Sequence, residues 1–172
     1  PVQYPKVGED PSSCKLGVVN TDSKEITWLK IPGDTKQNYI PRLQWIGDMV
    51  LAQQINRKQN ELKLWICNRE NGDAKMFYTE KDKAWVDITN ADFSETRRGM
   101  IDMPVVDEGA AVIRMTEKDG WRHLYKIEIE SGNEKLLSAG DYDVGSLYTI
   151  DEKKGLIYIS ASPENSTQRY LY

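Results

Sequence analysis

The sequence of 172 residues contains only one histidine, His123, and only two cysteines, Cys14 and Cys67. A Ser-His-Asp or Cys-His enzyme would have to use that single imidazole, and a histidine-based metal site would have one ligand available. Two cysteines without CxxC spacing are too few for a disulfide scaffold. Because both lie in strand-like runs, we expect them to be buried free thiols.

Long apolar runs and a basic excess are also missing. No run approaches the roughly 18 apolar residues that a membrane-spanning helix needs. The 23 lysines and arginines against 27 aspartates and glutamates give a net charge of −4, whereas a nucleic-acid binder normally carries a clustered basic excess. Five tryptophans and nine tyrosines supply apolar area that a disordered chain lacks. We therefore expect a folded chain with no nucleic-acid partner and no membrane span in this segment.

The local pattern indicates β-structure almost throughout. Short runs rich in Val, Ile, Tyr, Trp and Thr alternate with turn residues at roughly the 8- to 12-residue spacing of all-β folds. The strand candidates are 15–20, 25–31, 49–56, 61–68, 74–80, 110–115, 122–129, 134–138, 146–150 and 155–160. The pairs Asn71-Gly72, Asp119-Gly120 and Ser131-Gly132 accept positive φ in turns. No amphipathic helix pattern occurs, and 91–104 is expected to be a long loop with room for one helical turn.

An internal repeat indicates the architecture. The hairpin 64–75 aligns without a gap on 124–135, at an offset of 60. Shorter matches at offsets of 47 and 48 relate 122–125 to 169–172 and 16–20 to 64–68. A strand–turn–strand unit recurring every roughly 45 to 60 residues is typical of propeller blades. We predict an all-β fold: a partial β-propeller of about three and a half to four antiparallel four-stranded blades. The alternative is a sandwich of similar hairpins.

Propellers close as rings of roughly four to eight blades. Either four blades close here, or the chain belongs to a larger ring. The strand-like ending at 169–172 and the first residue, which is not Met, favour a single excised fragment over 1–172.

Several motifs resemble one family. Tyr4, Pro5, Lys6 and Gly8 form a YPKxG segment similar to that in the N-terminal β-propeller of the dipeptidyl peptidase IV family, serine exopeptidases of the prolyl oligopeptidase group. Further segments follow in the family's order: 15–22, Trp45 in LQWIGD, Asn56, Arg57, Gln59 and Asn60 in the NRxQN turn of bacterial members, Gly120, His123 and Tyr125 in EKDGWRHLY, and 155–160. We interpret these residues as structural.

The resemblance implies that every catalytic role lies outside this chain. In the family, an eight-bladed propeller caps a C-terminal α/β-hydrolase domain that supplies the serine, aspartate and histidine, and the glutamate pair that holds the substrate's amino terminus precedes YPKxG. The hydrolase domain is therefore expected to be absent here and to be the partner of this segment, which acts as scaffold and substrate gate. The parent would remove dipeptides after proline or alanine from peptide substrates, without a cofactor, and would be exported to the periplasm or outside a bacterium.

A direct search for chemistry agrees with this expectation. Ser146 lacks the second glycine of a nucleophile elbow, and His123 lies in an alternating strand, where a hydrogen-bonded structural role is favoured. The acidic pairs Glu9-Asp10, Asp107-Glu108 and Asp141/Asp143 lack calcium-loop spacing, so no metal site is expected.

For several other side chains, both a structural and a functional interpretation are open. Arg97 and Arg98 are candidates for the rim of the substrate cavity, with a solvated loop pair as the alternative. The five tryptophans are expected to fill the space between blades. Asn165 begins an N-x-S/T pattern, whose use depends on the secretory route.

Two rival function classes remain open: a non-enzymatic propeller scaffold that binds a protein or peptide, and an independent sugar- or metal-binding propeller enzyme. Exposed blade edges also predict self-association of the isolated chain.

Overall fold

The computed structural model describes residues 7–88 and 103–172. Its elements are β1 (Gly17–Val19), β2 (Ile26–Trp28), β3 (Asn38–Ile46), β4 (Met49–Asn56), β5 (Glu61–Asn68), β6 (Ala74–Lys81), β7 (Val105–Val106), the short 3₁₀ turn η1 (Asp107–Gly109), β8 (Ala111–Thr116), β9 (His123–Glu128), β10 (Glu134–Leu136), β11 (Val144–Asp151), β12 (Leu156–Ala161) and β13 (Tyr170–Leu171). No helix in these ranges is long and apolar enough to cross a membrane.

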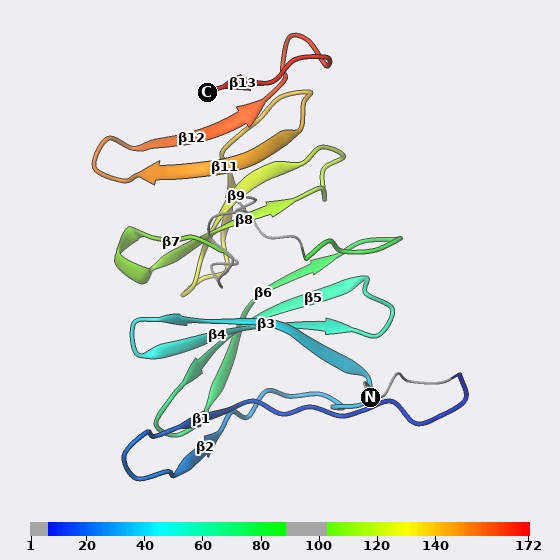
Figure 1. The fold of residues 1–172 in the computed structure, drawn as a ribbon, viewed down its shortest axis with the longest axis vertical. Helices are drawn as coiled ribbons and strands as arrows, with labels where there is room; N and C mark the ends of the chain where they lie inside the picture. Colours follow the sequence, from blue (N-terminus) through cyan, green and yellow to red (C-terminus); the bar gives the residue numbers. More distant parts are fainter. Residues whose placement is uncertain (1–6, 89–102) are drawn as a thin grey trace.

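The strands form four antiparallel sheets, and within each sheet every strand pairs with the next one along the chain. The sheets are β1–β2, β3–β6, β7–β10 and β11–β13, stacked in that order as an open fan (Figure 1). Two sheets have four strands and the terminal two have two and three. The predicted all-β fold and the predicted number of blades are therefore confirmed.

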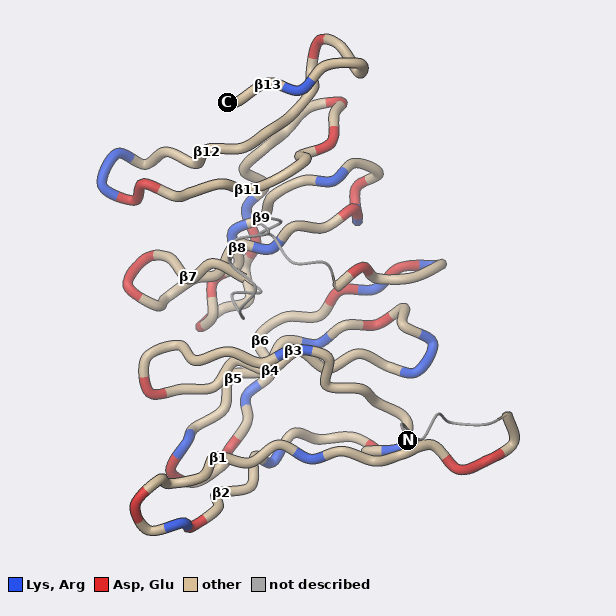
Figure 2. The backbone as a smooth tube through the Cα atoms, in the orientation of Figure 1, with Lys and Arg blue, Asp and Glu red and all other residues tan. Residues whose placement is uncertain are grey.

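The space between successive sheets holds the core. One apolar cluster joins the first two sheets and is centred on Val50, Trp65 and Cys67. A second cluster joins the middle two sheets, around Leu62, Phe77, Val112 and Ile127. A third cluster joins the last two sheets, around Ile113, Leu124, Val144 and Ile159. Strands in the middle of the stack are covered on both faces, which explains the continuous burial of β4 from Val50 to Ile55. Charged residues gather at the turns, at the two ends of the strands (Figure 2).

The repeated hairpins occupy equivalent places, since β5–β6 and β9–β10 are the third and fourth strands of their sheets. Gly72 and Gly132 have φ of 76° and 73° in their turns. A Cβ on Gly72 would lie 2.2 Å from the carbonyl oxygen of Trp28, and a Cβ on Gly132 would lie 1.9 Å from that of Phe77. Each glycine therefore lets its turn touch the last strand of the preceding sheet, a close approach that needs the missing side chain.

Each predicted strand overlaps an observed one, and two observed strands, β3 and β7, were not predicted. The predicted ranges 49–56 and 61–68 coincide with β4 and β5. No strand was predicted over β3, whose pattern Pro41 interrupts. The register shifts between Tyr39 and Arg42, and such irregularities accommodate proline in a strand. The two-residue β7 was also missed, and most of the 91–104 loop lies outside the described residues.

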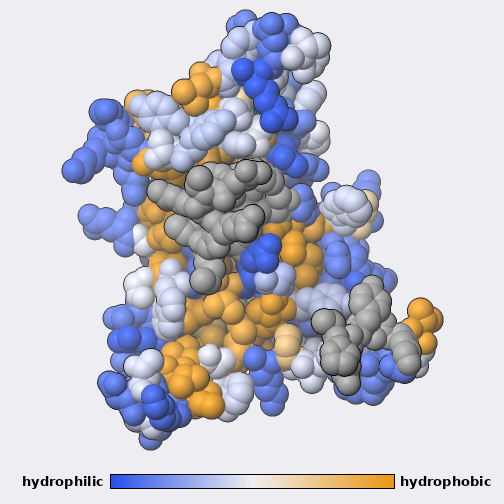
Figure 3. Space-filling model, viewed as in Figure 1, coloured by the Kyte–Doolittle hydropathy of each residue, from blue (hydrophilic) through white to orange (hydrophobic). Residues whose placement is uncertain are grey.

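The expectation that all five tryptophans are core was wrong. Trp65 is 7% exposed and its indole donates to Gln54 Oε1 at 3.1 Å. Trp28, Trp45, Trp85 and Trp121 are 40–70% exposed. The two-stranded first sheet leaves part of β3 uncovered, and Trp85 and Trp121 lie in connections. Figure 3 shows separate hydrophobic surface near β1–β2 and over the β3–β6 sheet.

The expectation for the cysteines held for one of the two. Cys67 is buried in β5, and burial raises the pKa of its thiol to about 11. Cys14 is exposed, because β1 begins only at Gly17.

Candidate functional site

The NRKQN motif forms the β4–β5 turn and is closed by its first asparagine. The Asn56 side chain accepts from the backbone N–H groups of Asn60 and Glu61 at 3.0 and 3.2 Å and donates to Asn60 Oδ1 at 2.8 Å. Gln59 has a φ of 57°, a conformation that the surrounding hydrogen bonds support. The sequence motif is thus a local device for a tight turn.

The same turn holds two connections between sheets. Arg57 donates its backbone N–H to Gln37 O at 3.0 Å, in the segment from β2 to β3. On the other side, Gln59 O accepts from Val86 N at 2.7 Å and Asn60 O accepts from Asp82 N at 3.1 Å. Because both connections are tied to one turn, the motif anchors them at one end of the strands of the second sheet, which supports the structural role proposed for it.

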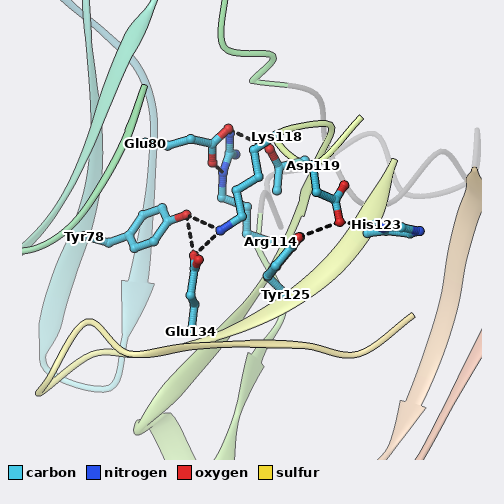
Figure 4. Close-up of polar contacts among 9 residues, drawn as sticks. Tyr78, Glu80, Arg114, Lys118, Asp119, His123, Tyr125 and Glu134 are labelled. Atoms are coloured by element: carbon cyan, nitrogen blue, oxygen red, sulfur yellow. Dashed lines mark hydrogen bonds and ion pairs between the residues drawn. The ribbon is translucent and has the colours of Figure 1, made fainter. Parts of the chain in front are cut away.

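A buried ion pair joins the second and third sheets (Figure 4). Arg114 of β8 contacts Glu80 of β6 with Nε–Oε2 at 2.7 Å and Nη2–Oε1 at 3.2 Å, and their side chains are 2% and 5% exposed. Thr116 donates to Glu80 Oε1 at 2.6 Å, and the carbonyl of Asp87 accepts from Arg114 at 2.8 Å. Both carboxylate oxygens of Glu80 and the Nε and Nη2 atoms of Arg114 have hydrogen-bond partners, which offsets the cost of burying the two charges.

A second cluster surrounds Lys118, in the β8–β9 turn. Its ammonium group pairs with Glu134, lies 3.2 Å from the Tyr78 hydroxyl and sits 3.9 Å from the centre of the Tyr125 ring. Tyr78 donates to Glu134 Oε2 at 2.8 Å. Burial opposes ionisation of Glu134, but the hydrogen bonds from Lys118 and Tyr78 outweigh it and lower the pKa of the carboxyl group. Burial and Glu134 together raise the pKa of Tyr78.

The EKDGWRHLY turn is organised by Asp119. Its Oδ2 atom accepts from His123 Nδ1 at 2.8 Å and from the Tyr125 hydroxyl at 2.7 Å. Burial works against the charge, but these bonds outweigh it and lower the pKa of Asp119. Gly120 has a φ of 99° in this turn, which is why glycine belongs at that position.

His123 has a structural position. The carboxylate of Asp119 can only accept, so Nδ1 carries the hydrogen. The side chain is 2% exposed, its Nε2 atom has no hydrogen-bond partner in the described ranges, and its ring meets that of Tyr142 edge-on at 5.9 Å. Ser146, the other catalytic residue considered, lies in β11 opposite Ser160. The two are not brought together as nucleophile and base.

The remaining predicted residues fall in different places. Tyr4, Pro5, Lys6, Arg97 and Arg98 lie outside the described residues. Gly8 is exposed and has a φ of 88° with open space around it, while Trp45 is 54% exposed on β3. One member of each acidic pair has a partner from another segment: Asp10 contacts Lys36, Asp107 contacts Lys126, and Asp143 accepts from the backbone N–H of Arg122. No group of three potential ligands placed to hold a metal occurs in the described ranges.

Sequence reasoning missed the polar network between the sheets. Its central residues are Tyr78, Glu80, Arg114, Lys118 and Glu134. One signal was available: Arg114 interrupts an otherwise apolar run, AAVIRM, where a charged residue needs a buried partner. Its partner Glu80 lies 34 positions away, and no local pattern relates the two.

Comparison with known proteins gives one consistent family. The family model of the dipeptidyl peptidase IV (DPP IV) N-terminal region matches residues 1–172. The protein named "Probable dipeptidyl peptidase 4" from Emericella nidulans is 26% identical over 178 residues, and the Trichophyton rubrum protein named "Dipeptidyl peptidase 4" is 24% identical over 177. Each match covers 99% of this chain and 22% of the relative, so the chain spans about a fifth of their length.

The fold agrees with a solved structure. Porphyromonas gingivalis dipeptidyl peptidase 4 matches with a TM-score of 0.79 at 23% identity, over 99% of this chain and 23% of that one. At this identity the match supports the fold alone, whereas the family model covers the whole sequence. The chain belongs to the family of dipeptidyl peptidase IV N-terminal regions.

Proposed function

We propose that this chain is the non-catalytic propeller segment of a serine exopeptidase that removes dipeptides from the amino termini of peptides, with proline or alanine at the penultimate position. Membership of the dipeptidyl peptidase IV N-terminal family carries this proposal. The two residues in the described ranges that the sequence offered for nucleophilic chemistry, His123 and Ser146, serve the fold. A C-terminal α/β-hydrolase domain supplies the chemistry, and the propeller acts as scaffold and substrate gate.

A chromogenic dipeptide substrate tests the proposal. A longer gene product containing this sequence should release p-nitroaniline from Gly-Pro-p-nitroanilide, and the 172-residue chain alone should give no turnover. Turnover by the chain alone would show that its residues carry chemistry. An inactive but folded longer product would favour the scaffold function described next. Export of that product to the periplasm or medium, measured by cell fractionation, tests the proposed location.

The second candidate function is a non-enzymatic scaffold that binds a protein or peptide. One observation favours it: the two ends of the stack expose apolar side chains, Val19, Ile26 and Trp28 at one end and Tyr148, Leu156 and Leu171 at the other. Such faces also support self-association of the isolated chain. Light scattering should then show a mass that rises with concentration, and a constant monomer mass would reject this.

A further inference from the structure

A side-chain-sized cavity lies beside the polar network, on the face formed by the β8–β9 turn and the connection that follows β6. Its volume is about 220 Å³ and its lining includes Asp82, Trp85, Asp87, Thr116 and Glu117. Pockets that enclose whole small molecules begin at roughly 300 Å³. The cavity is therefore of a size to receive one side chain of a larger ligand.

The wall that carries Trp85 is held firmly in place. Asp82 N and Val86 N donate to the β4–β5 turn at 3.1 and 2.7 Å, and the carbonyl of Asp87 accepts from Arg114 at 2.8 Å. Val86 is 5% exposed and belongs to the apolar cluster between the middle sheets. These contacts fix the backbone on both sides of Trp85, so a ligand would meet a preorganised wall.

Trp85 itself is not packed, although its neighbours are. Its side chain is 70% exposed, the largest fraction among the exposed tryptophans of the described chain, while Trp65 is 7% exposed. Exposing an indole forgoes the gain from burying it. The π-face of an indole attracts cations more strongly than that of tyrosine or phenylalanine.

The charged residues around the cavity favour a positively charged ligand. Asp82 and Asp87 form no ion pair within the described ranges, and Asp82 Oδ1 accepts from the backbone N–H of Ala84 at 2.6 Å. Other charges at the cavity are matched already: Glu80 pairs with Arg114, and Glu117 pairs with Arg122 at 3.3 Å. The ammonium group of Lys118 is directed to Glu134 and the Tyr125 ring. The carboxylates of Asp82 and Asp87, two residues of the cavity lining, are therefore the ones without a cationic partner in the described ranges.

We propose that this cavity binds the positively charged side chain of a peptide, preferentially arginine. A guanidinium group can stack on an indole while its N–H groups donate to carboxylates, and its weaker hydration lowers the cost of binding compared with lysine. The inference rests on the proposed function only in taking a peptide as the ligand. It adds a preference for a basic residue, separate from the chemistry of cleavage.

The direct test is a titration of the ¹⁵N-labelled 172-residue chain with acetyl-Gly-Arg-Gly-amide, followed by NMR. The indole N–H signal of Trp85 should shift and saturate, and the matched Gly-Gln-Gly peptide should leave it in place. Raising the salt concentration from about 20 to about 200 mM should weaken binding severalfold, because the interaction is between partly exposed charges.

Variants then separate the ring from the carboxylates. Trp85→Ala should weaken binding about fivefold or more, read from the backbone amides of Val86 and Thr116. The double variant D82N/D87N keeps the Asp82 acceptor oxygen and the Asp87 carbonyl, and should also weaken binding severalfold. Trp45→Ala, which removes another exposed indole away from the cavity, should leave the affinity unchanged. If Trp85→Ala does not fold, Trp85→Phe should give an intermediate loss.

Equal shifts for the arginine and glutamine peptides would overturn the proposal, as would unchanged affinity in D82N/D87N. The test is independent of peptidase activity because it uses the chain without any other domain. A longer gene product without turnover would reject the proposed function and leave the cavity standing. Turnover without arginine binding would reject only the cavity.

Discussion

Two seams between neighbouring sheets share one geometry and differ in what fills them. At the first seam, between β1–β2 and β3–β6, Gly72 meets the carbonyl of Trp28; at the second, between β3–β6 and β7–β10, Gly132 meets that of Phe77. The first seam is filled by apolar side chains around Trp65. The second adds a buried ion pair and the cluster around Lys118.

This difference separates spacing from filling. The turn glycine recurs because it sets how closely two sheets approach, and no side chain can replace it there. The side chains that pack between two sheets differ from seam to seam. Apolar side chains stabilise the first seam, and ion pairs contribute to the second as well. Stability at the first seam should therefore depend little on pH, while the second should respond to the removal of single charges.

The largest effect is expected from breaking the buried pair of the second seam. Arg114→Ala leaves Glu80 charged, buried and facing Thr116 alone, and should lower the free energy of unfolding by about 3–5 kcal/mol. Urea denaturation followed by circular dichroism measures it. The first-seam control is Lys30→Met, which breaks the ion pair between Lys30 and Asp73, two side chains that are 65% and 64% exposed. This substitution should lower the free energy of unfolding by no more than about 1 kcal/mol. Equal losses would contradict the contrast.

Alanine at the turn glycines should give the next largest loss. Gly72→Ala and Gly132→Ala each combine a left-handed backbone with a collision against the preceding sheet, and should cost about 2–4 kcal/mol. The control is Gly155→Ala, at a φ of 67° with open space around it, which should cost only about 1 kcal/mol. Losses at Gly72 and Gly132 no larger than at Gly155 would show that the turn, and not the seam, requires glycine.

Acid should act mainly on the third sheet and the second seam. The lowered pKa values of Asp119 and Glu134 mean that the folded chain holds fewer protons than the unfolded chain near pH 4. Stability therefore rises with pH in that window and is lost as pH falls below about 4 to 5. Asp119→Asn should flatten the curve of unfolding free energy measured from about pH 3 to pH 7.

A first-seam variant provides the control for this pH dependence. Val18→Ala removes apolar contact at the first seam without changing a charge, so it should lower the whole curve and keep its slope. An unchanged slope in Asp119→Asn would reject the assignment of the acid sensitivity to this carboxylate.

Features that depend on residues close together in the sequence were predicted correctly, whereas features that depend on residues from different sheets were not. The turns at Gly72, Gly120 and Gly132 were predictable because their residue pairs specify positive φ locally. The blade repeat was readable because equivalent hairpins share residues at a fixed offset. The network of Glu80, Arg114 and Glu134 was not, because its partners come from different sheets and each residue alone resembles a solvated charge.

The exposure of the tryptophans was mispredicted for a related reason. Strand position tells which side chains alternate across a sheet, but burial also needs a neighbouring sheet that covers that point. Trp65 has such a neighbour and Trp45 does not. Trp85 lies in a connection between strands, where the alternation of apolar and polar residues does not predict burial. Its side chain lines a cavity.

The smallest effect is expected at the β1–β2 turn, where Lys24 stands 48 positions before Gly72 with a φ of 64°. Each turn contains the same type of hydrogen bond: Lys24 N donates to Asn20 O at 3.0 Å, and Gly72 N donates to Asn68 O at 3.0 Å. Because Lys24 is exposed, only its left-handed backbone is unfavourable, and Lys24→Gly should stabilise the chain by less than about 1 kcal/mol in thermal unfolding. The reverse exchange, Gly72→Lys, places the same side chain against Trp28 and should destabilise strongly. If both exchanges had small effects, the close approach of the sheets would not be what retains glycine at Gly72 and Gly132.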